Sequence, residues 1–166
     1  AGHTLTGHLV VTGSHVTIKN LTIDYKNTFS ESEDGTLTVN KTAISVFSDN
    51  VTIDNCVINC STDHWLSNAI TVFPTSEDAN IVLTNNTINN ANQSVGGDLA
   101  SGIQIVEGYS YDYTGLDDAQ KPEGTSKVMT NFDALAVMEN NEIKNATTDI
   151  SYIDYSENDA VTKAIQ

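Results

Sequence analysis

Arginine is absent from the sequence, and apart from four histidines its basic residues are seven lysines. Against them stand 22 acidic residues, so the formal net charge is −15 at pH 7. A chain of this charge repels nucleic acid and anionic membrane surfaces. We therefore expect no nucleic-acid partner. The excess of carboxylates is typical of a highly soluble surface, and it would also suit Ca²⁺, which prefers oxygen ligands.

Long apolar runs are missing as well. No run approaches the ~20 residues of a membrane-spanning helix, and no signal peptide is visible, so we expect no membrane insertion. Proline occurs only twice, which suits many short, uninterrupted strands. Valine, isoleucine and threonine are frequent, whereas strong helical runs are absent. The sequence therefore predicts an all-β chain.

Cysteine is scarce too, since Cys56 and Cys60 are the only two. On one straight strand they would lie roughly 13 Å apart, which is too far for a disulfide. We expect two buried thiols in the core, and a disulfide across a local turn is the alternative. Without histidines at zinc-binding spacing, the two thiols indicate a metal site only weakly.

A repeating unit is clearest in residues 44–60, ISVFSDNVTIDNCVINC. Aliphatic residues alternate with polar ones in three short runs, which predicts three strands. A polar link separates the first run from the second, and Asn55 separates the second from the third. Asparagine tolerates the left-handed backbone of a sharp bend. The unit is therefore strand, link, strand, asparagine bend and strand.

Further copies of the unit begin at Leu9, Ile70 and Ile103, and a partial one begins at Ile150. With the copy at Ile44, successive starts are 35, 26 and 33 residues apart, so the loops vary while the strands keep their pattern. Such units stack as a solenoid, because one unit cannot bury its apolar side alone. The bend asparagines are expected to form a structural ladder from coil to coil, and they are Asn20, Asn55, Asn85 and Asn140.

We expect a single domain over residues 1–166, which is also a candidate segment of a longer solenoid. Residues 1–8 are a cap or the tail of a preceding turn. The dipeptide Asp34-Gly35 indicates a small hairpin. Residues 107–133 are too long for a simple connector, so we expect them to cover or bind something. The predicted insertions are residues 24–42, 59–68, 89–101 and 107–133.

The strings VTIKNLTI, VTIDNCVINC and IVLTNNTINN resemble coils of the right-handed parallel β-helix proteins of the pectate-lyase-like superfamily. The resemblance covers residues 9–105 and 134–145. It implies three strands per coil in three sheets, with an asparagine-rich bend between the second and third strands. About four to five coils would form, with long inserted loops. The resemblance is specific for fold and weak for function, because this architecture hosts many activities.

The resemblance also implies that a substrate would lie along the outer face of the first-strand sheet. The outward residues there are Ser45, Thr71 and Gln104, which include no carboxylate and no base. Lyases of the superfamily use an arginine or lysine beside Ca²⁺-binding aspartates, its esterases an aspartate pair with arginine, and its polygalacturonases clustered aspartates with Gly-His-Gly. This chain has neither arginine nor Gly-His-Gly, so we expect no catalysis of those kinds and assign no catalytic residue.

Several loop residues are candidate glycan ligands. The loop that holds His64 and Trp65 flanks the expected groove, and a loop tryptophan can stack on a sugar ring. The alternative is that Trp65 folds back onto the solenoid. A second set of aromatic residues would present a glycan platform or cover the end of a sheet, and it consists of Tyr109, Tyr111 and Tyr113. No cofactor is required; Asp117 and Asp118 are the weak candidates for Ca²⁺.

Two classes of function follow. We expect a non-catalytic, secreted or cell-surface β-helix module that is adhesin-like or structural. Its candidate partners are a polysaccharide or surface glycan and, through its open ends, further copies of itself. The alternative is a carbohydrate-active enzyme, a polysaccharide lyase or glycoside hydrolase, either whole or truncated.

Overall fold

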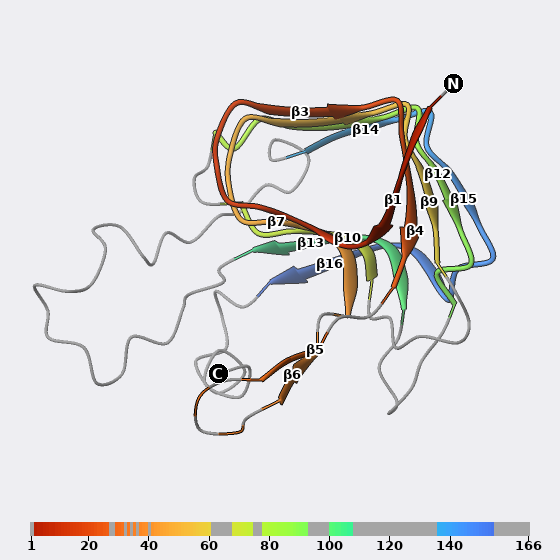
Figure 1. The fold of residues 1–166 in the computed structure, drawn as a ribbon. Helices are drawn as coiled ribbons and strands as arrows, with labels where there is room; N and C mark the ends of the chain where they lie inside the picture. Colours follow the sequence, from red (N-terminus) through yellow and green to blue (C-terminus); the bar gives the residue numbers. More distant parts are fainter. Residues whose placement is uncertain are drawn as a thin grey trace, which may run out of the picture.

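The computed structural model describes residues 2–26, 29–31, 33, 35, 37–39, 41–60, 68–74, 78–92, 100–107 and 136–154. All regular elements in these residues are strands (Figure 1). The strands are β1 (His3–Gly7), β2 (Leu9–Val11), β3 (Val16–Lys19), β4 (Leu21–Tyr25), β5 (Phe29–Glu31), β6 (Leu37–Val39), β7 (Thr42–Val46), β8 (Val51–Asp54), β9 (Val57–Asn59), β10 (Asn68–Val72), β11 (Ile81–Thr84), β12 (Thr87–Asn89), β13 (Ser101–Glu107), β14 (Ala136–Glu139), β15 (Glu142–Lys144) and β16 (Thr148–Asp154).

Three parallel sheets run along the molecule. Sheet A has the order β1-β4-β9-β12-β15, sheet B the order β16-β13-β10-β7-β2, and sheet C the order β14-β11-β8-β3. Each full coil contributes one strand to sheet B, then one to sheet C and one to sheet A, as β7, β8 and β9 do. Successive coils therefore lie over one another (Figure 1). This is the predicted parallel β-helix with three strands per coil.

The register of the sheets places equivalent aliphatic residues in columns. Ile70 pairs with both Ile44 and Ile103, and all three side chains are fully buried. Burial of an isoleucine side chain stabilises the fold by about 1.5–3 kcal/mol. Leu9, which has a neighbouring coil on one side only, is half-buried. The core is therefore continuous along the solenoid axis and open where the stack stops.

Both ends carry incomplete coils. Strand β1 pairs with β4, which identifies residues 3–7 as the closing strand of a preceding turn rather than a cap. Strand β16 pairs with β13 in the register Ile103 to Ile150, so the partial fifth copy is confirmed. The predicted hairpin is confirmed too: β5 and β6 pair antiparallel, and Gly35 between them has a φ of 81°.

The bends between sheets C and A have the predicted left-handed backbone. The φ angles of Asn20, Asn55, Asn85 and Asn140 are 57°, 50°, 56° and 55°. Main-chain bonds connect neighbouring bends, because the N–H of Asn55 donates to the carbonyl of Thr84 at 3.0 Å and the N–H of Asn85 to that of Glu139 at 3.0 Å. Asparagine is used here because it adopts positive φ more readily than other non-glycine residues.

The side chains of the bend asparagines form a shorter ladder than the repeat suggested. Asn55 Nδ2 donates to Asn20 Oδ1 at 2.8 Å, as expected. Asn85 Nδ2 instead donates to Oδ1 of Asp54 at 2.8 Å, and the Thr84 hydroxyl donates to the same oxygen at 2.8 Å. A carboxylate is a stronger acceptor than an amide oxygen. Asp54 therefore interrupts the amide ladder one coil after it begins.

A second asparagine ladder, which was not predicted, lies inside the solenoid. Asn86 follows the bend directly and is fully buried. Its Nδ2 donates to the carbonyl of Ile53 at 2.9 Å and to Oδ1 of Asn141 at 3.0 Å. Its Oδ1 accepts the N–H of Cys56 at 3.0 Å. These bonds satisfy buried main-chain groups at the corner of three coils.

Cys56 and Cys60 are both free and buried, as predicted. The Cys56 thiol contacts the carbonyl of Asp54 at 3.5 Å. Burial raises the pKa of Cys56, and it raises the pKa of Cys60 to about 12. Both thiols therefore belong to the core and are held in the protonated form.

Candidate ligand-binding face

The three residues proposed for the outer face of sheet B lie next to one another. Thr71 pairs in register with Ser45 on one side and with Gln104 on the other. Gln104 in turn pairs with Ser151 of β16. These four residues, called the polar row below, cross sheet B parallel to the solenoid axis.

The polar row is more deeply buried than an outer face usually is. Ser45 is 7% exposed and Thr71 is 3% exposed, whereas Gln104 and Ser151 are half-buried. The sequence pattern predicted that these side chains point away from the core, but it gave no sign that part of the row would be buried. A ligand would therefore reach the row over β13 and β16, because Thr71 and Ser45 lie deeper than Gln104 and Ser151.

A hydrogen-bond network surrounds the polar row. Gln104 Oε1 accepts from Asn68 Nδ2 at 2.9 Å, and Gln104 Nε2 donates to the Ser151 hydroxyl at 3.2 Å. The hydroxyls of Ser101 and Ser151 are 2.9 Å apart. Asn68 and Ser101 are 5% and 2% exposed. Sequence reasoning missed both, because each lies two residues before an inward isoleucine, where alternation predicts a core position.

Thr71 is the exception within this network. Its hydroxyl oxygen Oγ1 is buried and has no hydrogen-bond partner in the described residues. A buried polar group without a partner costs about 1–3 kcal/mol, and such groups in folded proteins call for an explanation. The hydroxyl is thus an unused donor and acceptor beside the amide of Gln104.

Two aromatic rings stand where strands β7 and β10 end. The rings of Phe47 and Phe73 are stacked, with centroids 4.6 Å apart and planes within 2° of parallel. They follow Val46 and Val72, which pair in register, so the spacing of the coils sets the spacing of the rings. Each ring therefore turns one face to the other and is not a free stacking platform. The signal in the sequence was a phenylalanine three residues after Ile44 and Ile70.

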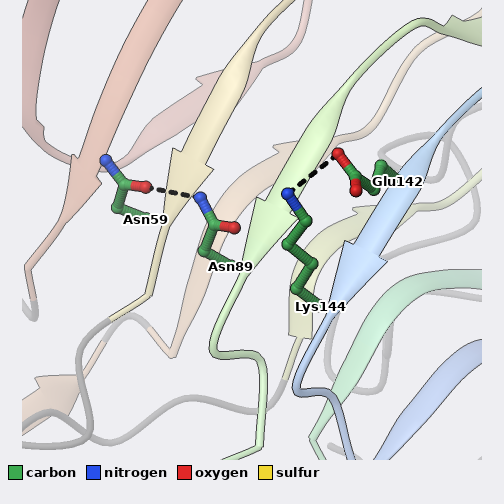
Figure 2. A network of polar contacts seen from close by, with 4 residues as sticks. All are labelled: Asn59, Asn89, Glu142 and Lys144. Carbon is green, nitrogen blue, oxygen red and sulfur yellow. Dashed lines mark hydrogen bonds and ion pairs between the residues drawn. The ribbon is translucent and has the colours of Figure 1, made fainter.

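The outer face of sheet A carries a different kind of ladder. Asn59 Nδ2 donates to Asp24 Oδ1 at 2.8 Å, and Asn89 Nδ2 donates to Asn59 Oδ1 at 2.9 Å. Figure 2 shows that this ladder ends at the next strand, where Lys144 pairs with Glu142 of its own strand at 2.9 Å. These side chains are half to largely exposed, and each bonds to at least one of the others.

The other candidates from the sequence lie outside the described residues. They are His64, Trp65, Tyr109, Tyr111, Tyr113, Asp117 and Asp118. The structure therefore tests neither the aromatic glycan platform nor the weak Ca²⁺ candidates. In the part of the chain that is described, no group of three or more His, Cys, Asp or Glu side chains could hold a metal ion.

Among the described residues, the titratable groups with shifted pKa values lie away from the polar row. Burial raises the pKa of Tyr25 on sheet A, close to Cys60. Hydrogen bonds from Asn85 and Thr84 lower the pKa of Asp54 at the bend. The row and its network are built from hydroxyl and amide groups, which suit hydrogen bonding to a neutral polar ligand.

Within the described residues, no helix is long and apolar enough to cross a membrane. Comparison with protein families, with curated proteins and with solved structures found no match to this chain.

Proposed function

We propose that this chain is a non-catalytic β-helix module of the pectate-lyase-like type, secreted or displayed at a cell surface, that binds a glycan along the outer face of sheet B. The observation that carries the proposal is the polar row itself, in which half-buried Gln104 and Ser151 lie beside the buried, unpartnered hydroxyl of Thr71. Sugar hydroxyls are donors and acceptors, so a glycan is the class of ligand that a row of hydroxyl and amide groups complements.

The chemistry of the row supports binding rather than turnover. General acid–base cleavage of a glycoside uses two positioned carboxylates, and the four members of the row are Ser45, Thr71, Gln104 and Ser151. Neutral donors and acceptors fix the orientation of a polar ligand, and each such bond contributes about 0.5–1.5 kcal/mol. Recognition by this row would therefore be selective and of modest affinity.

Thr71→Val is the most direct test, because it replaces the hydroxyl with a methyl group of similar size. The variant and the wild type are screened on an array of acidic and neutral glycans, and hits are measured by isothermal titration calorimetry. We expect Thr71→Val to lose about two- to tenfold in affinity while its melting temperature rises, since an unsatisfied buried hydroxyl is removed. Unchanged affinity would show that the row does not bind the glycan.

Thr87→Val is the matched control. Thr87 lies on the outer face of sheet A, where its neighbour in the previous coil is already a valine, Val57. This variant should bind as the wild type does. Trp65→Ala separates a contribution of the tryptophan from that of the row.

A further assay addresses the enzymatic alternative. The chain is incubated with acidic and neutral polysaccharides in the presence of Ca²⁺, and new reducing ends or unsaturated products are measured. Turnover above background that is lost when loop carboxylates are replaced would overturn the non-catalytic assignment.

A further inference from the structure

The apolar side chains left exposed by the fold gather at the two ends of the solenoid. Among the described residues the exposed large hydrophobic side chains are Val10 at 48%, Val137 at 47%, Ile150 at 37% and Tyr152 at 45%. They belong to β2, β14 and β16, which are the edge strands of sheets B and C. Exposed apolar groups confined to such edges indicate surfaces for association.

The end that carries the N-terminal strands is hollow. A cavity of about 560 Å³ opens there, between strands β2, β3 and β4. Its lining includes the inward side chains of the first full coil, Leu9, Val11, Val16, Ile18 and Leu21, together with Val10, Thr12, Gly13, Thr17 and Lys19. In the middle of the solenoid the next coil covers the equivalent side chains, so this cavity is the uncovered cross-section of the core.

Main-chain groups at this end also have no strand partner among the described residues. The N–H of Phe47 donates to the carbonyl of Val11 at 2.8 Å, so Val11 directs its main-chain groups toward β7. In a parallel sheet alternate residues bond to opposite neighbours. Val10 therefore directs its N–H and carbonyl toward the open edge of sheet B, where they are available to another strand.

The two ends carry opposite charge. Residues 2–23 contain no Asp or Glu, and they hold Lys19 and three of the four histidines. Residues 136–154 contain four acidic residues and one lysine, which is a formal charge of −3. In a chain with a net charge of −15 this contrast favours contact between unlike ends over contact between like ends.

From these observations we propose that copies of this chain associate head to tail, the N-terminal edge of one stacking on the C-terminal edge of the next. Strand β2 of one copy extends sheet B beyond β16 of the other, and β1 extends sheet A beyond β15. The internal register then continues across the junction. Leu9 lies over Ile150, Val11 over Tyr152 and Val10 over Ser151, as Leu9, Val11 and Val10 lie over Ile44, Val46 and Ser45 within the chain.

Sheet C is not continuous across this junction. Each coil adds one strand to each sheet, so when sheets A and B continue from one copy to the next, one strand position in sheet C stays empty between β14 of one copy and β3 of the other. The described residues provide no sheet C strand for the level between them. The contact thus rests on sheets A and B. It is heterologous, so it can propagate into a filament, and it is independent of the glycan proposal.

Two variants test the contact from opposite ends. Val10→Pro removes the N–H that the next copy would use, and proline is tolerated on an edge strand. Val10→Thr keeps that N–H and is its control. Tyr152→Lys places a charge on the other end, at a residue that is 45% exposed. Circular dichroism and thermal melting confirm that each variant is folded.

Sedimentation velocity and light scattering then give the molar mass as a function of concentration. Wild type and Val10→Thr should exceed the monomer mass of 17.8 kDa as concentration rises, whereas Val10→Pro and Tyr152→Lys should each stay monomeric. An equimolar mixture of these two should form dimers and nothing larger, because one intact end of each kind remains. A strictly monomeric wild type, or a Val10→Pro variant that assembles normally, would overturn the proposal. Glycan binding is also measured on monomeric Val10→Pro. Binding by this variant would show that the glycan proposal holds without stacking, so each proposal can fail without the other.

Discussion

Asn86 and Asn141 occupy the same position in successive coils, directly after the left-handed bend, and Nδ2 of Asn86 donates to Oδ1 of Asn141 at 3.0 Å. Asn141 Nδ2 repeats the pattern by donating to the carbonyl of Leu83 at 2.7 Å, as Asn86 does to Ile53. A corner between two strands leaves main-chain groups without ladder partners. The buried amides supply those partners and join one coil to the next.

Asn86→Ala should destabilise the fold by about 2–4 kcal/mol, because the N–H of Cys56 is left buried and unpaired and the amide bonds to Ile53 and Asn141 are lost. The free energy of unfolding is measured by urea denaturation.

Asn89→Ala is the control for the same amide chemistry at the surface. Asn89 donates to Asn59 at a half-exposed site, where water replaces the lost bond, so we expect a loss below about 1 kcal/mol. Equal losses for the two variants would mean that the inner ladder has no special role.

The fold was predictable because its signal is repeated. Each coil places aliphatic residues at the same intervals, so the columns through Ile44 and Ile70 could be read from spacing alone. The bend asparagines were predictable for a local reason, since few other residues adopt positive φ. The aliphatic spacing and the preference of asparagine for positive φ both act within one coil, so both can be read from the sequence.

The details that depend on contact between coils were not predictable. Asp54 captures the amide of Asn85 because a carboxylate from one coil meets an amide from the next. Asn86 occupies the buried position that Cys56 has one coil earlier, and its amide bonds to Ile53 and Asn141 depend on neighbouring coils. The deep burial of Thr71 is not encoded in residue spacing. The composition of the candidate face was therefore visible in the sequence, whereas its burial and its unsatisfied hydroxyl were not.

Acid should weaken the fold partly through Asp54. The hydrogen bonds from Asn85 and Thr84 lower its pKa in the folded state from the ordinary value of 3.8. A carboxyl with a depressed folded pKa contributes stability above its unfolded pKa and loses it as pH falls through the folded pKa.

Asp54→Asn isolates this effect, because the amide oxygen still accepts a bond but does not titrate. The difference in melting temperature between wild type and Asp54→Asn should be constant from about pH 7 to pH 5 and should shrink below about pH 4. A difference that stays the same down to about pH 2 would exclude a titrating role for Asp54.

The two thiols should be inert in the folded protein. Burial raises the pKa of Cys60 to about 12, and the thiolate is the form that reacts with disulfide reagents. At about pH 8 we expect no reaction of the native chain with dithionitrobenzoate. In urea both cysteines should react, and two thionitrobenzoate ions should be released per chain. The rate of labelling then reports opening of sheet A near Tyr25. Fast labelling of one thiol in the native state would show that its coil is not closed.

Two coils approach each other closely at Gly102. A Cβ added there would lie 2.8 Å from the carbonyl oxygen of Asp149 and 2.8 Å from Cγ2 of Ile143. The isoleucine can change rotamer, but the carbonyl belongs to the main chain of β16, so Gly102→Ala must push β16 away from β13. We expect a loss of about 1–3 kcal/mol in the free energy of unfolding, together with faster hydrogen exchange of the β16 amides.

Gly13→Ala is the control, since nothing lies within 4 Å of its added Cβ and its φ is unstrained. That variant should be neutral or stabilised by up to about 1 kcal/mol. If Gly102→Ala were as stable as Gly13→Ala, β13 and β16 would not be packed as closely as their register requires, and the C-terminal edge used for stacking would have a different shape.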